Sequence, residues 1–273
     1  MSGERSGTFI ATKEHRRFIE FAEAVRKHRY VGLCYGAAGV GKTLSARRYA
    51  HWDLASPVIE AWNTRRDSSR AKVNEALERS RTVFHTPTVL GTLRDLKETL
   101  GEHIDRVDSC IDDQLHRHVK GCRIITCDEL LVEMLIFDEA ERLSVTALEF
   151  IRDIFDRKGV GVILIGMPGM EKRLSRYPQL YSRVGFAHHY RPLQGDELSF
   201  VLTRHWRKLG LTLDEADFTD TQAIASIARI TGGNFRLLHR LFVQIERILK
   251  INGLSVITDD VVEAARSTLV IGI

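Results

Sequence analysis

Residues 36–43, with the sequence GAAGVGKT, constrain the fold of this chain more than any other segment. They match the pattern G-x-x-x-x-G-K-[ST], in which glycines let the backbone curl until its N–H groups point at phosphate oxygens. The segment follows the apolar run YVGLCYG and precedes KTLSARRYAHW, which has helical character. The amides and positive dipole end at the start of such a helix complete a phosphate site. We therefore predict a phosphate-binding loop between a buried strand and a helix.

The pattern also assigns roles within the loop. Lys42 is expected to reach the β- and γ-phosphates of a nucleotide, and the Thr43 hydroxyl is expected to ligate Mg²⁺. ATP and Mg²⁺ are thus the predicted ligand and metal. The nucleotide-binding residues predicted in this segment are Gly36, Ala37, Ala38, Gly39, Val40, Gly41, Lys42, Thr43 and Leu44.

A second apolar run, MLIFDEAE from residue 134, ends in two adjacent acids. A parallel strand would deliver these acids beside the phosphate loop, because ligands bind at the carboxyl ends of such strands. Asp138 is expected to hold Mg²⁺ through water, and Glu139 to orient and deprotonate the attacking water. A carboxylate placed to act on water indicates hydrolysis rather than transfer of a phosphoryl group to a small molecule.

Apolar runs alternate with helical patterns through the first two thirds of the chain. Besides the runs already named, 83–89, 160–169 and 188–193 read as strands, while 12–29, 91–104 and 145–159 read as helices. Near-continuous apolar strands alternating with helices predict an α/β fold, a parallel sheet covered by helices. Beyond Pro192 only helical periods occur, which predicts a small all-helical domain. The expected boundaries are an N-terminal helical segment at 1–30, a nucleotide-binding domain at 31–194 and a helical domain at 195–273.

Together these segments resemble the AAA+ ATPases over most of the chain. GAAGVGKT corresponds to Walker A, LIFDEAERL to Walker B, YSRV to the box with the arginine finger, and GGNFR to sensor 2. The resemblance implies an AAA+ fold with a helical lid. It assigns Arg183 as a catalytic finger that reaches a neighbouring subunit, because no use for it within its own subunit is evident; a surface salt bridge is the alternative interpretation of this arginine. Arg236 is implied to contact the nucleotide as sensor 2, and the alternative is an ordinary arginine on a helix surface.

Within the AAA+ proteins, the runs EMLIFDEAERL and VILIGMPGMEKRL and the compact length are similar to the TnsC/TniB transposition regulators, with MuB more distant. This resemblance implies a homo-oligomer, a ring or helical filament, that assembles with ATP on double-stranded DNA independently of sequence. Its implied partners are a transposase and target-selector proteins, and its implied task is to mark target DNA. The AAA+ pattern often has a polar sensor 1 residue after the fourth strand. ILIGMPG offers none, so we expect slow hydrolysis.

The resemblance places the DNA contacts after the second strand, at Thr92, Arg94 and Lys97, with Arg106 nearby. Each could contact phosphate without reading sequence. Adjacent acids make ordinary helix-surface charges an equally good interpretation for these residues. The basic run NTRRDSSRAK at 63–72, expected to be an exposed loop, is a rival site for DNA or for a protein.

Two alternative functions remain open from the sequence. An initiator or helicase-loader ATPase shares almost all of these motifs, although such proteins usually carry an added DNA-reading module, for which we expect no room here. A nucleotide-gated protein-interaction switch that never touches DNA fits the acidic stretch 83–133, which holds 10 acidic and 6 basic residues.

The composition of the chain bears on its binding partners and on its cellular compartment. The 273 residues carry a formal net charge of +4, concentrated in residues 1–82, where 16 Lys and Arg face 9 Asp and Glu. Such a basic region could face an anionic polymer. No apolar run is long enough for a membrane helix and no secretory signal is evident, so we expect a cytoplasmic protein. The four cysteines, including Cys122 and Cys127, lack the spacing of a zinc site and are expected to be free thiols.

Overall fold

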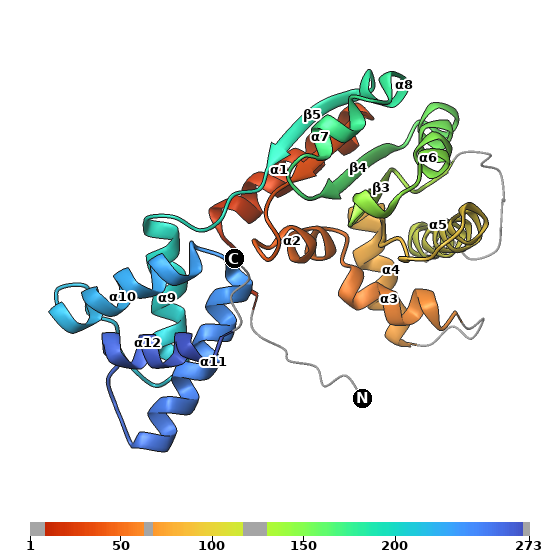
Figure 1. Ribbon diagram of the computed structural model, residues 1–273. Coiled ribbons are helices and arrows are strands. Elements are labelled where there is room, and N and C mark those ends of the chain that lie inside the picture. The colour runs from red at the N-terminus through yellow and green to blue at the C-terminus, as the bar shows by residue number, and fades with distance from the viewer. Residues whose placement is uncertain (1–8, 63–67, 117–129, 270–273) are drawn as a thin grey trace. The chain divides into compact units, whose positions relative to one another are not determined.

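Two compact units make up the part of the chain that the computed structural model describes, which is residues 9–62, 68–116 and 130–269 (Figure 1). The α/β unit comprises Arg17–Gly36 and Lys42–Tyr190. The helical unit comprises Ala37–Gly41, the chain from Arg191 onward and the described residues before Arg17. The phosphate-loop segment Ala37–Gly41 therefore groups with the helical unit, although residues of the α/β unit flank it in sequence.

Among the described residues, five parallel strands form the sheet of the α/β unit, in the order β2-β3-β4-β1-β5. All residues of β2, β3 and β4 are buried, which explains their near-continuous apolar sequences. In β5, at one edge of the sheet, half-buried and exposed residues alternate, so one face of this strand is open to solvent. The predicted parallel sheet is confirmed. The strands are β1 (Val31–Tyr35), β2 (Thr82–His85), β3 (Met134–Phe137), β4 (Gly161–Gly166) and β5 (Val184–His189).

Helices connect these strands, as the alternating pattern predicts. Phe18, Ala22 and Val25 of the first helix are fully buried, which confirms the apolar stripe expected at 12–29. The helix expected at 91–104 is longer than its pattern suggested and continues to Leu115. The elements are α1 (Lys13–His28), α2 (Lys42–Tyr49), α3 (Trp52–Glu60), α4 (Ser68–Ser80), α5 (Leu93–Leu115), the 3₁₀ turn η1 (Ala140–Arg142), α6 (Val145–Lys158), α7 (Met170–Leu174) and α8 (Pro178–Tyr181).

Two predicted strands are wrong in their extent. The second strand ends at His85 instead of continuing to residue 89, because Pro87 has no N–H for a ladder and the neighbouring β3 ends at Phe137. The last strand is Val184–His189, not 188–193. Its mixture of glycine, alanine and histidine gives no apolar run, which fits a strand along which half-buried and exposed residues alternate.

The described part of the basic run at 63–72 is helical, which corrects our expectation of an exposed loop for residues 68–72. Residues 63–67 lie outside the described residues, but α4 begins at Ser68. Arg70 is buried, and its guanidinium lies 3.9 Å from the centre of the Trp62 ring. Stacking on indole lets an arginine bury its charge at modest cost, so at least this residue packs inside the protein.

The helical unit has its own apolar core. Trp206, Leu241 and Ile245 are fully buried in it, together with residues from each of its long helices. Asn234 and Thr258 cap two of these helices through their side chains. The helices are α9 (Asp196–Lys208), α10 (Phe218–Thr231), α11 (Phe235–Asn252) and α12 (Asp259–Ser267).

The described residues include two of the four cysteines. Cys122 and Cys127 fall outside the described residues, whereas Cys34 and Cys110 are buried and are not part of a disulfide bond. None of the helices within the described ranges combines the length and apolarity needed to cross a membrane.

Candidate nucleotide-binding site

The residues at the two ends of the phosphate loop meet within the α/β unit. Lys42 is the first residue of α2, and its Nζ donates a hydrogen bond to the Gly36 carbonyl at 2.5 Å. The lysine is only 8% exposed, so its charge is held at the loop rather than in bulk solvent. Gly36 has no space for a side chain, because an added Cβ would collide with the Tyr190 carbonyl oxygen. The chain therefore folds as a tight loop that presents one buried cation.

The central part of the loop is held by the start of α11, within the helical unit. The Asn234 side chain donates to the Ala38 carbonyl at 2.6 Å, and the Arg236 backbone N–H donates to the Gly39 carbonyl at 3.1 Å. Gly39 has a φ of 79°, and an added Cβ there would lie 2.6 Å from the Asn234 Oδ1. Only glycine meets both conditions. The Arg236 side chain is exposed, and its backbone is what touches the loop.

Asn234 is a site residue that the sequence interpretation missed. It caps α11 by accepting hydrogen bonds from the N–H groups of Arg236 and Leu237, at 3.0 and 3.2 Å. The same side chain donates to the loop through its amide nitrogen. An asparagine between a glycine pair and an apolar helix is a recognisable cap signal, although nothing in the signal indicates the second bond.

Thr43 and Asp138 come together as the metal prediction requires. The Thr43 hydroxyl donates to an Asp138 carboxylate oxygen at 2.7 Å. Asp138 is 4% exposed, and burial raises the pKa of its carboxyl group, while hydrogen bonds from Thr43 and from the Glu139 N–H act in the opposite direction. A bound cation would stabilise the ionised form of this buried carboxyl group. A hydroxyl and a carboxylate fit Mg²⁺, which keeps several waters and takes further oxygens from phosphates.

Glu139 stands next to Asp138 in an unusual backbone conformation. Its φ is 50° and its ψ is 46°, a left-handed geometry that few non-glycine residues adopt. The side chain is 43% exposed and forms an ion pair with Arg142. Such strained conformations persist where the surroundings fix them, and they are frequent at functional sites.

The end of β4 bears no polar side chain, as the sequence indicated. The strand closes at Gly166, whose carbonyl accepts a hydrogen bond from the Gly36 N–H at 3.4 Å. Met167 follows, 40% exposed. The strand tip thus contacts the loop through backbone atoms. The expectation of slow hydrolysis stays a prediction.

Arg183 has a partner within its own subunit, which corrects the expectation that it has none. Its Nε and Nη2 donate to the two oxygens of Asp156 at 2.6 and 2.8 Å, and its Nη1 donates to the Gln179 carbonyl. Hydrogen bonds from Arg183 lower the pKa of the Asp156 carboxyl group. Both arms of the guanidinium are occupied, so any role in a neighbouring subunit requires this pair to open.

The four residues predicted to contact DNA lie on α5 or at its start, in different surroundings. Thr92 caps the helix, with Asp95 completing a capping box. Arg94 is exposed, and the Lys97 ammonium lies 5.1 Å from the centre of the Phe150 ring. Arg106 donates to the Ile59 carbonyl at 2.8 Å and to Glu102 at 2.7 Å. Arg94 and Lys97 therefore offer accessible charge, whereas Arg106 joins α5 to α3.

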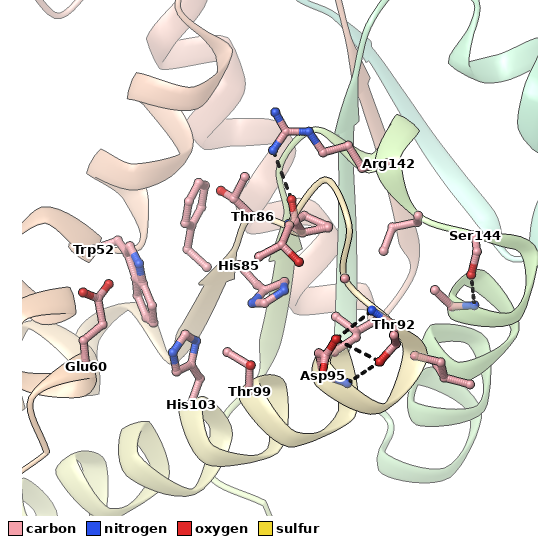
Figure 2. A pocket seen from close by; sticks show the side chains of 18 of the residues that line it. Trp52, Glu60, His85, Thr86, Thr92, Asp95, Thr99, His103, Arg142 and Ser144 are labelled. Carbon is pink, nitrogen blue, oxygen red and sulfur yellow. Dashed lines mark hydrogen bonds between the residues drawn. The ribbon is translucent and has the colours of Figure 1, made fainter.

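The α/β unit contains a cavity of about 310 Å³ beside the start of α5. It lies between that helix, the end of β2 and the turn after β3 (Figure 2). His85 points into it and is buried. Burial lowers the pKa of His85 to about 4, and the nearby His103 adds to the shift, so this imidazole is neutral at physiological pH. Arg142 also lines the cavity. No motif in the sequence indicated this cavity.

Comparisons with known proteins bear on the family and the fold of this chain. A family profile described as an AAA domain matches residues 25–174. A potential ATP-binding protein of Staphylococcus aureus is 42% identical over 98% of this chain and 99% of its own length. The Mu-like prophage FluMu DNA transposition protein B of Haemophilus influenzae is 25% identical, over 86% of this chain and 71% of its own.

Solved structures show the same fold at low identity. The Thermotoga maritima RuvB Holliday junction branch migration motor gives a TM-score of 0.55 at 17% identity, covering 94% of this chain and 69% of that one. The Aeropyrum pernix ORC2 protein in its ADP form gives 0.55 at 14% identity, covering 98% and 70%. These similarities concern the fold alone, and they confirm the predicted P-loop sheet followed by a helical region. With the family profile spanning more than half of its residues, the chain belongs to the AAA domain family.

Proposed function

We propose that this protein is an ATP hydrolase that uses Mg²⁺ and assembles with ATP into oligomers or filaments on double-stranded DNA. In this proposal it regulates transposition by marking target DNA and recruiting a transposase. The contact between Thr43 and Asp138, with Glu139 as the next residue, carries the hydrolase part. The 25% identity to a Mu-like DNA transposition protein B, over 86% of the chain, supports the transposition part.

Each site residue has a role in the proposed reaction. Lys42 and the loop amides neutralise the β- and γ-phosphates, and Thr43 and Asp138 hold the metal. Magnesium, when bound, would draw charge from the phosphate oxygens. Glu139 accepts the proton of the attacking water, and Arg183 of a neighbouring subunit stabilises the transferred phosphoryl group. Arg236 acts as sensor 2, at the start of the helix that holds the loop.

Electron microscopy with duplex DNA and a non-hydrolysable ATP analogue tests the assembly. We expect rings or filaments only when both ligands are present. Lys42→Ala should form none, since loss of the buried cation removes the main charge that faces the phosphates. Monomers in every condition would contradict assembly and would favour a switch whose partner is a protein.

DNA binding is expected to depend on Arg94 and Lys97, whose charges are accessible. Replacing both by alanine should weaken binding equally on unrelated sequences and reduce the slope of log affinity against log salt by about 1 per lost phosphate contact. Fluorescence anisotropy over a salt series would measure both effects. Arg157→Ala is a matched control, because Arg157 is an exposed arginine on α6 that pairs with Asp153. Equal losses in the control would contradict a specific role for α5.

One observation favours the nucleotide-gated protein-interaction switch as the second candidate. Val89 and Leu90, between β2 and α5, are 74% and 93% exposed. Exposed apolar side chains on a loop suit a protein partner. If the protein binds ATP but no duplex DNA at low salt, this candidate becomes the better one.

A further inference from the structure

Glu139 and Arg142 are brought together by the 3₁₀ turn that follows β3. The turn η1 spans Ala140–Arg142, with Glu139 as its N-terminal cap. Arg142, the last residue of the turn, lies three residues after Glu139, and their side chains form an ion pair. The backbone of Glu139 is left-handed, with a φ of 50°.

Arg142 is anchored at a second point. Its Nη1 donates to the Pro87 carbonyl at 3.1 Å, in the segment between β2 and α5 (Figure 2). The backbone around it is braced as well, because the Arg173 guanidinium donates to the carbonyls of Glu141 and Leu143. Arg142 is only 34% exposed. If the Glu139 side chain moves, Arg142 can follow it only by losing the hydrogen bond to Pro87. We therefore expect the ion pair to break when Glu139 moves.

The ion pair conflicts with the role proposed for Glu139. A general base must direct a free oxygen at water, within hydrogen-bond distance. An arginine that faces the carboxylate with its N–H donors competes for the same lone pairs. The pair must therefore open, or rearrange, before Glu139 accepts a proton.

We propose that Arg142 is a positioning residue that restrains Glu139 in an ion pair, so that opening this pair is part of the barrier to ATP hydrolysis. The inference rests on the proposed hydrolase function. Arg142 does not touch the nucleotide in this proposal. It acts through Glu139, and its own position is fixed by the Pro87 carbonyl.

Steady-state ATP turnover of Arg142→Ala and Arg142→Lys tests the restraint. Exposed ion pairs have modest strength, so removing this one should raise kcat by about two- to fivefold and leave KM unchanged. Lysine keeps the charge but cannot pair in the fork geometry of arginine, so its kcat should lie between those of the wild type and the alanine variant. Arg266→Ala is a matched control, because Arg266 pairs with Glu263 at the same spacing on α12.

A thermodynamic cycle supplies a readout that needs no hydrolysis. Unfolding in urea of wild type, Glu139→Gln, Arg142→Ala and the double variant should show a coupling of about two- to fivefold in the unfolding equilibrium constant. A coupling of zero between the two substitutions would show that Glu139 and Arg142 do not form the ion pair. An unchanged or lower kcat in both Arg142 variants would show that Arg142 does not restrain Glu139. If the wild type hydrolyses no more ATP than Glu139→Gln, the proposed hydrolase function fails, and the restraint fails with it.

Discussion

Replacing Glu139 by glutamine should lower ATP turnover by about 10²- to 10⁴-fold, the usual contribution of a positioned general base. Glutamine keeps the size of the side chain but cannot take a proton from water. ATP binding should persist, because Lys42, Thr43 and Asp138 are untouched. Phosphate release would measure turnover, and titration with a fluorescent ATP analogue would measure the dissociation constant.

Glu141→Gln is the matched control for this prediction. Glu141 lies two residues further along the same turn, and its side chain is exposed. We expect close to wild-type turnover from it. Equal losses in the two variants would show that the charge of the whole turn matters, and normal turnover in Glu139→Gln would remove Glu139 from the mechanism.

Arg183→Ala should lower the turnover of the assembled protein by about 10³- to 10⁵-fold, the contribution of an arginine finger. In this structure the guanidinium binds Asp156 of its own chain, so it can serve a neighbour only after that pair opens. Assembly has to supply the energy of opening. We therefore expect turnover per subunit to rise with protein concentration in the wild type, and to stay low at every concentration in the variant.

Mixing two inactive variants tests whether Arg183 acts between subunits. Arg183→Ala keeps Glu139, and Glu139→Gln keeps Arg183, so a mixed assembly contains some interfaces with both intact residues. Turnover should reappear on mixing, in proportion to such interfaces. No recovery, from variants that still assemble in the electron microscope, would place the action of Arg183 inside its own subunit or outside catalysis.

The chemistry of consecutive residues could be predicted from the sequence, whereas pairings between distant residues could not. GAAGVGKT and the acids after MLIF mark the loop and the metal carboxylate because each motif is a short run with one strong structural solution. Asp156 is 27 residues from Arg183, and nothing in either segment indicates that they meet. Arg70 looked like exposed charge, since its partner Trp62 becomes visible only when the chain folds.

Strand ends were the least predictable part of the fold. Residues 83–89 contain several residues typical of strands, but a strand ends where its neighbour does, and β3 stops at Phe137. The edge strand β5 is missed for the opposite reason. Because one of its faces is exposed, it needs no apolar run, so its sequence resembles that of a loop.

The contact between the phosphate loop and α11 has a mechanical consequence. Ala38 and Gly39 are bonded to the first residues of a helix 18 residues long, which spans about 27 Å. One face of that helix is buried along its length, at Leu238, Leu241 and Ile245 among others, so it moves as a stiff rod with little bending. A shift of the loop at Gly39 would therefore be passed through α11 to the residues packed along it, as far as Leu249.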